Sequence, residues 1–238
     1  MPWDFFVILV VLGVVVPWRG AARIRELLAR PELNSGERLA LYVSTATFQW
    51  LLTALVYWRC QFRGYTNLEL GIGVPDVFRV AIAAGILSIV LTINQLASVR
   101  FLSRLPHEKR GFVAEFARRI MPHDANEILG FTALVATVAI CEEFLYRGFV
   151  QAVFRDLAGP VVAIVISSVF FAVGHIYQGR RGLLATFVVG VLFALARQWT
   201  GSLAPSMIAH FATDFCAGIA SWKWLMDPVQ VASHDGAA

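Results

Sequence analysis

Two twenty-residue stretches of the chain, Leu39–Trp58 and Val80–Val99, contain no charged side chain. At about 1.5 Å of rise per residue, a helix of that length is about 30 Å long, which is the thickness of the hydrocarbon layer of a bilayer. The whole composition agrees, since 58% of the residues are hydrophobic, 15% are charged and the mean hydropathy is +0.67. The sequence therefore predicts an integral membrane protein.

The charge and the cysteines give no support to nucleic-acid binding, to a disulfide scaffold or to a thiolate metal site. The net charge is +4, but the basic residues lie at the ends of apolar stretches and form no basic stripe, so nucleic acid is not expected as a partner. The three cysteines, Cys60, Cys141 and Cys216, form no CxxC pair. Neither a disulfide scaffold nor a thiolate metal site is indicated.

Hydrophobic stretches and their breakers predict an all-α polytopic bundle of about seven membrane spans. Asp124, followed by Glu127, marks a helix start, and Gly159-Pro160 marks a break. The segment Arg100–His123 is polar with phenylalanines every fourth residue, which fits either an amphipathic helix on the membrane surface or a plain solvated helix. The predicted spans are Trp3–Trp18, Leu39–Trp58, Val77–Ser98, Asp124–Phe154, Pro160–Gln178, Gly182–Gln198 and Leu203–Trp222.

The distribution of basic residues predicts the orientation. With seven spans, fourteen of the 20 Lys and Arg residues fall on one side and five on the other, with Arg147 inside the membrane. Cytoplasmic loops carry the excess of basic residues. We therefore expect the N-terminus outside and a C-terminal tail, residues 223–238, in the cytoplasm of a cell whose inner or plasma membrane holds the protein.

The fourth predicted span carries three charged residues, Glu142, Glu143 and Arg147, in an otherwise apolar run. A charge at the centre of a membrane helix costs about 2.5–3.5 kcal/mol on insertion scales, so a group of three indicates a use for them. Glu143 and Arg147 are four residues apart on one helical face and are predicted to pair, which leaves Glu142 free to face a cavity. The alternative is an ion pair that only holds helices together.

Other ionisable residues inside the predicted spans are few. His175 lies near the end of the fifth span, and His210 and Asp214 share a face of the seventh. Each could be a helix contact by itself, but three carboxylates and two imidazoles on three spans together predict a site. Glu142 and Asp214 fall near the middle of their spans, whereas His175 lies about 9 Å past the middle of its own. Either the fifth span is tilted, or the cavity opens on that side, and we predict a polar cavity open to the cytoplasm.

The ordered motifs Glu142-Glu143-xxx-Arg147, Phe171-xxx-His175 and His210-xxx-Asp214 resemble those of the CPBP family of intramembrane proteases, the CAAX prenyl endopeptidase and bacteriocin-processing (Abi) group. The resemblance covers residues 124–222 and implies a catalytic helical core there. Residues 1–123 would supply three further spans and the Arg100–His123 linker. One residue departs from the pattern, because many members carry Asn where this chain has Asp214, and only an amide can donate a hydrogen bond.

The resemblance implies an intramembrane endopeptidase that acts on membrane-associated or lipidated peptides among membrane lipids. Two mechanisms for activating the water that hydrolyses the peptide bond stay open. Glu142, His175 and His210 can hold a zinc ion that acidifies bound water, or Glu142 can be the general base while the histidines orient the water and stabilise the oxyanion. A non-enzymatic alternative, a proton-coupled transporter or a scaffold, would use the same residues. Neither HExxH nor GxSxG occurs, so zincin and serine-hydrolase readings lack support.

Overall fold

The computed structural model describes residues 1–30 and 32–225, and within these ranges the chain forms helices and connecting turns without a strand. The predicted all-α fold is confirmed. The predicted tail falls almost wholly outside the described residues, which end at Leu225. The helical elements are α1 (Trp3–Val10), η1 (Val11–Val15), α2 (Val16–Ala29), α3 (Ser35–Phe62), α4 (Val77–Ser103), α5 (His107–Ile120), α6 (Ala125–Glu143), η2 (Phe144–Val150), α7 (Gln151–Ala158), α8 (Pro160–Gly174), η3 (Ile176–Gln178), α9 (Gly179–Thr200) and α10 (Ala204–Leu225).

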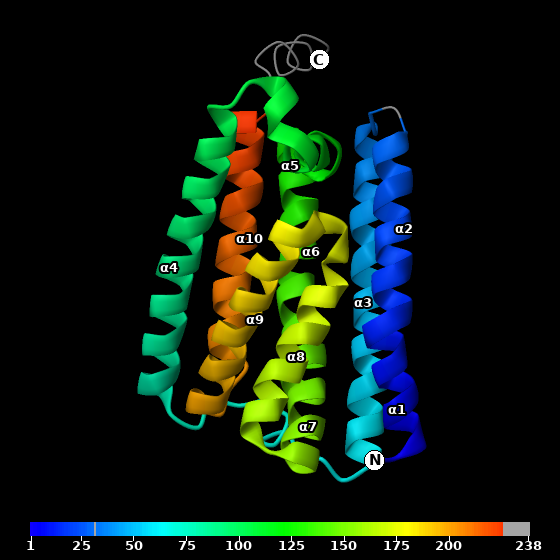
Figure 1. Ribbon diagram of the computed structural model, residues 1–238, viewed down its shortest axis with the longest axis vertical. Helices are drawn as coiled ribbons and strands as arrows, with labels where there is room; N and C mark the ends of the chain where they lie inside the picture. Colours follow the sequence, from blue (N-terminus) through cyan, green and yellow to red (C-terminus); the bar gives the residue numbers. More distant parts are fainter. Residues whose placement is uncertain (31, 226–238) are drawn as a thin grey trace.

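The long helices run roughly along one direction (Figure 1). The first helix, in which α1, η1 and α2 follow one another end to end, stands beside α3 at one edge. Helix α4 packs along α10 at the other edge, and α6 to α9 lie between them. Helix α5 sits across the end of the bundle at which α4 ends and α6 begins. We call this end the α5 end.

Five helical stretches among the described residues are long and apolar enough to cross a membrane, which supports an integral membrane protein. The predicted number of seven spans is not confirmed, because α8 has only 15 residues and α10 is not among the five. Helix α10 nevertheless runs along the bundle beside α4 (Figure 1). The five stretches are Trp3–Ala29, Ser35–Phe62, Val77–Ser103, Ala125–Ala158 and Ile176–Thr200.

The first helix is longer than the predicted Trp3–Trp18 and continues to Ala29 through the π-helical turn η1. Pro17 comes two residues after this turn, and a π turn accommodates the missing backbone N–H of a proline. Asp4, the one acidic residue of the predicted span, forms ion pairs of 2.5 Å with Arg59 and 2.8 Å with Arg63, which lie at the C-terminal end of α3. These pairs explain why a carboxylate is tolerated in an apolar helix.

A single long helix, formed by α6, η2 and α7, carries the charged motif. It begins where the sequence predicts, because the Asp124 carboxylate accepts a hydrogen bond of 2.8 Å from the Glu127 amide. It ends at Ala158, and Gly159, with φ of 83°, turns the chain so that Pro160 can start α8. Proline at the first position of a helix loses no intrahelical hydrogen bond.

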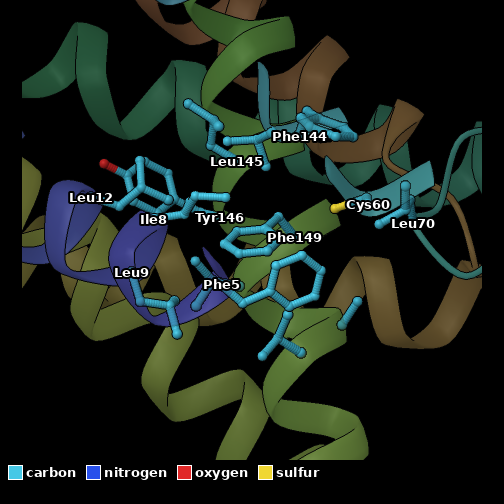
Figure 2. Packing of buried hydrophobic residues seen from close by; sticks show 14 of the residues in the cluster. Phe5, Ile8, Leu9, Leu12, Cys60, Leu70, Phe144, Leu145, Tyr146 and Phe149 are labelled. Carbon is cyan, nitrogen blue, oxygen red and sulfur yellow. The ribbon is translucent and has the colours of Figure 1, made fainter. Parts of the chain in front are cut away.

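The largest buried hydrophobic cluster packs the first helix against the π-helical turn η2. Figure 2 shows Phe5, Ile8 and Leu12 of the first helix gathered around Tyr146 and Phe149. Phe5 and Phe149 meet edge to face, with ring centroids 5.1 Å apart. The N-terminal helix, which lies outside the predicted catalytic core, therefore supports the segment that carries Arg147.

Helix α5 lies where an amphipathic surface segment is predicted, but its apolar face contacts protein. Phe112 and Phe116 both lie 6.2 Å from the ring of Tyr177, and Phe116 stacks on it. Ala117 and Ile120 are buried. The helix is therefore a cover over the α8–α9 connection.

Buried polar contacts fix the junction of α5 and α6. Arg38 of α3 donates a hydrogen bond of 2.8 Å to Glu127 and another of 2.9 Å to the carbonyl of Arg119. The Tyr42 hydroxyl donates to the Ile120 carbonyl at 2.5 Å. Burial, with Arg38 beside the ring, lowers the pKa of His123 in the connecting turn, so this imidazole stays neutral to lower pH than usual. The cover is thus anchored through neutral and paired groups.

Candidate active site

The short helix α8 places His175 inside the bundle. Fifteen residues span only about 22 Å, which is less than the hydrocarbon thickness. His175 ends α8 with φ of −106°, and the turn to α9 lies well short of the α5 end (Figure 1). The predicted span Pro160–Gln178 is therefore too long. The predicted difference in depth between His175 and Glu142 is not observed. Helix α8 stops at Gly174, inside the bundle, and His175 at its end lies 4.0 Å from Glu142.

Glu142 and His175 face each other. Their Oε2 and Nε2 atoms are 4.0 Å apart, and each side chain is 17% exposed. His175 Nδ1 lies 2.8 Å from the Phe171 carbonyl, which can only accept, so Nδ1 carries a hydrogen and Nε2 of a neutral ring offers a lone pair. Glu142 Oε2 is buried and has no hydrogen-bond partner. Two acceptors arranged in this way are suited to bind a proton or a water molecule between them.

Gln49 of α3 is the third side chain at this pair, and the sequence analysis missed it. Its Nε2 donates a hydrogen bond of 3.2 Å to Glu142 Oε1. The available signal was one amide inside the uncharged stretch Leu39–Trp58, on the helix face that also carries Tyr42, Thr53 and Val56. Polar residues inside membrane helices usually face the protein interior and often mark functional sites.

Glu143 and Arg147 form the predicted pair. Arg147 donates a hydrogen bond of 2.9 Å to Glu143 Oε1, and both side chains are fully buried. The guanidinium also donates to the Gly190 carbonyl at 3.2 Å and lies 4.0 Å from the centre of the Phe171 ring. Arg147 belongs to η2, and π-helical turns are frequent at functional sites. The ion pair joins α6, η2, α8 and α9.

His210 joins the other glutamate. Its Nδ1 lies 3.1 Å from Glu143 Oε1, and its Nε2 lies 3.4 Å from Asp214 Oδ2. The ring is buried between Phe171 and Phe193, with centroids 5.9 and 5.7 Å away. An imidazole with a hydrogen on each nitrogen donates to both carboxylates. The site thus contains two units, Glu142 with His175 and Glu143 with His210.

This arrangement does not fit the predicted zinc ligands. Among residues 1–30 and 32–225, no three His, Cys, Asp or Glu side chains are grouped so that they could hold a metal ion. Glu142 and His175 supply two donors, while both nitrogens of His210 face other carboxylates. The ligand set Glu142, His175 and His210 stays a prediction that requires His210 to turn.

Aromatic rings cover the Glu142–His175 pair toward the α5 end. The ring of Tyr177 lies 5.9 Å from that of His175, and Phe116 stacks on Tyr177. A cavity of about 420 Å³ lies beside α5, and none of the predicted site residues lines it. Its lining residues are Leu28, Gly111, Phe112, Ala114, Glu115, Arg118 and Leu225. The polar cavity expected around Glu142 stays a prediction.

Comparisons with known proteins agree with the motifs. Residues 124–216 match the sequence model of a family described as "Type II CAAX prenyl endopeptidase Rce1-like". A curated protein of Bacillus subtilis (strain 168), called "Uncharacterized protein YpbD", is 32% identical over 101 residues, which are 42% of this chain. The match covers 46% of that relative, so the chain spans about half its length. No solved structure matches.

The matched region contains α6 with its charged motif, the α8–α9 hairpin with His175, and the half of α10 that carries His210 and Asp214. These are the elements that bring the two glutamate–histidine units together. Residues 124–216 are therefore similar to the Rce1-like family of type II CAAX prenyl endopeptidases, in agreement with the resemblance that the three ordered motifs carry.

Proposed function

We propose that this protein is an intramembrane endopeptidase that hydrolyses peptide bonds of membrane-associated or lipidated peptides. The observation that carries this proposal is the partly buried Glu142–His175 pair, 4.0 Å apart, in a region that matches the Rce1-like family. The direct test is cleavage of a lipidated reporter peptide by the purified protein in detergent. A proton-coupled transporter or a scaffold would leave the reporter intact.

In this mechanism Glu142 is the general base. A water molecule between Glu142 Oε2 and His175 Nε2 gives a proton to the carboxylate and attacks the peptide carbonyl carbon, and the proton then passes to the leaving amine. The bond between Nδ1 and the Phe171 carbonyl keeps Nε2 of His175 directed at the water. We assign oxyanion stabilisation to His210: Glu143 keeps the hydrogen on Nδ1, and the hydrogen on Nε2 moves from the half-exposed Asp214 carboxylate to the oxyanion as it forms.

Substitution of Asp214 separates this mechanism from the zinc alternative. In the glutamate mechanism we expect Asp214→Asn to retain or raise activity, because an amide can donate to the oxyanion. Activity should also persist after exhaustive chelation, with no stoichiometric transition metal found by elemental analysis. Asp156→Asn is the matched control, because Asp156 is also about half exposed and ion-paired, with Arg155.

The opposite result would support the zinc ligands Glu142, His175 and His210. In that case Asp214 would hold the His210 ring for the metal, and Asp214→Asn would weaken metal affinity by about 10–100-fold. Stoichiometric zinc, chelator-sensitive cleavage and a damaging Asp214→Asn together would contradict the glutamate mechanism.

We further propose that the α5 end faces the cytoplasm, because most of the basic residues lie there. In a variant with Cys60, Cys141 and Cys216 replaced by alanine, Lys109→Cys at the exposed surface of α5 should resist an impermeant maleimide in intact cells. Leu68→Cys, 62% exposed in the loop at the opposite end, should react. Permeabilised cells supply the control, in which both cysteines react. The reverse pattern in intact cells would contradict the orientation.

A further inference from the structure

The inward face of α3 contains one amide that no motif of the matched family region includes. Tyr42, Thr53 and Val56 on this face are buried, and Gln49 lies among them. On the other side of the helix Leu51 is 67% exposed, and Trp50, which is 46% exposed, lies at the flank between the two faces. Since α3 packs along α6, its inward face meets the helix that carries Glu142.

The contact of Gln49 with Glu142 has only one chemically sensible orientation. Glu142 Oε1 is a carboxylate oxygen 3.2 Å from the amide nitrogen, and an ionised carboxylate can only accept a hydrogen bond. The amide therefore presents Nε2 to Glu142, and its Oε1 is buried without a hydrogen-bond partner. Glu142 Oε2 is likewise buried and without a hydrogen-bond partner. The amide holds one carboxylate oxygen and leaves the other for His175.

We propose that Gln49 is a positioning residue for the reaction: its amide fixes the rotation of the Glu142 carboxylate so that Oε2 points at His175 Nε2. The inference rests on the proposed function and adds a residue of α3 to the site. The last torsion angle of a glutamate side chain, χ3, has a broad distribution. Without this hydrogen bond, Oε2 would therefore have no fixed direction toward the histidine. A general base must lie within hydrogen-bond reach of the proton that it removes.

A purely structural role for Gln49 would be to hold α3 against α6. A second polar contact at the same interface already does this, since Trp50 Nε1 donates to Thr137 Oγ1 at 3.1 Å. The hydrogen bond joins two residues that are not part of the proposed site. It provides a matched control, because Thr137→Val removes it with little change in volume.

The test compares Gln49→Met and Gln49→Glu with Thr137→Val in the full-length purified protein. We expect Gln49→Met to lower kcat by about 10–100-fold, the size of a hydrogen bond to a charged group, with KM and Tm close to those of the wild type. Gln49→Glu should lower kcat further, because it places a second carboxylate beside the first. Thr137→Val should retain kcat. An unchanged kcat in Gln49→Met, or a loss that follows Tm equally in both interface variants, would overturn the proposal.

A second readout does not need turnover. A hydrophobic carbodiimide modifies protonated carboxyl groups, and mass spectrometry can quantify its adduct on Glu142, with Glu142→Gln as the blank. Loss of the amide donor frees Oε1 and the whole carboxyl group to move, so Gln49→Met should label faster than wild type or Thr137→Val. Faster labelling in a protein that cleaves no reporter would support the Gln49 contact while contradicting the endopeptidase function. Equal labelling in a protein that does cleave would contradict the contact alone.

Discussion

Glu142→Gln is expected to lower kcat for reporter-peptide cleavage by about 100- to 10,000-fold, because general-base catalysis contributes that much. Glutamine has nearly the same shape as glutamate, and the side chain is 17% exposed and carries no ion pair with Arg or Lys among the described residues. The fold should therefore be nearly unaffected. Initial rates in detergent, with Tm measured on the same preparations, check both parts.

The control for this prediction is Glu26→Gln, at an exposed glutamate of α2 that pairs with Arg30. It should keep both the rate and Tm. Cleavage by Glu142→Gln at more than about a tenth of the wild-type rate would contradict the role of Glu142 as the base. A loss of activity that accompanies unfolding would show that the substitution acts on the fold and would contradict the expected stability.

Glu143→Ala is expected to destabilise the protein by about 3–5 kcal/mol, the usual cost of removing one partner from a buried ion pair. Arg147 would remain fully buried with its charge unmatched, held by the Gly190 carbonyl and the ring of Phe171. His210 would lose the partner of its Nδ1 as well. Denaturant unfolding in mixed micelles, followed by circular dichroism, measures the loss.

Glu26→Ala is the matched control for this loss, since Glu26 and Arg30 are also an i, i+4 pair of the same kind. Their side chains are 63% and 55% exposed, so solvent screens the interaction, and exposed pairs contribute about 0–1 kcal/mol. A Glu143→Ala variant as stable as Glu26→Ala and fully active would show that the roles assigned to the two glutamates are wrong.

The membrane class, the helical fold and the ionisable residues that the bundle brings together, though not Gln49, could be predicted from the sequence. An uncharged stretch of twenty residues that crosses lipid is expected to be a helix, because a helix forms the hydrogen bonds of its backbone N–H and C=O groups within the segment. The pairing of Glu143 with Arg147 also follows from local geometry, since both residues lie on one helix. His175, His210 and Asp214 stand out because ionisable residues are rare inside the apolar stretches.

The partners of the histidines were decided by packing between helices. The sequence could not show that His175 faces Glu142 while His210 faces Glu143, because this depends on the rotation of α8 and α10 about their axes. The early end of α8 likewise sets the depth of His175 through the turn to α9. Gln49 stood in an uncharged stretch with no spacing to link it to Glu142, 93 residues away.

What the sequence by itself determined was therefore what acts within one helix: its apolar character, the Asp124 cap and the i, i+4 pair of Glu143 with Arg147. The tertiary structure alone decided which carboxylate meets which imidazole, that α5 covers the α8–α9 turn, and that α3 contributes an amide. The physical reason is that helix rotation and depth in lipid are set by side-chain packing against neighbouring helices, and hydropathy carries no information about either.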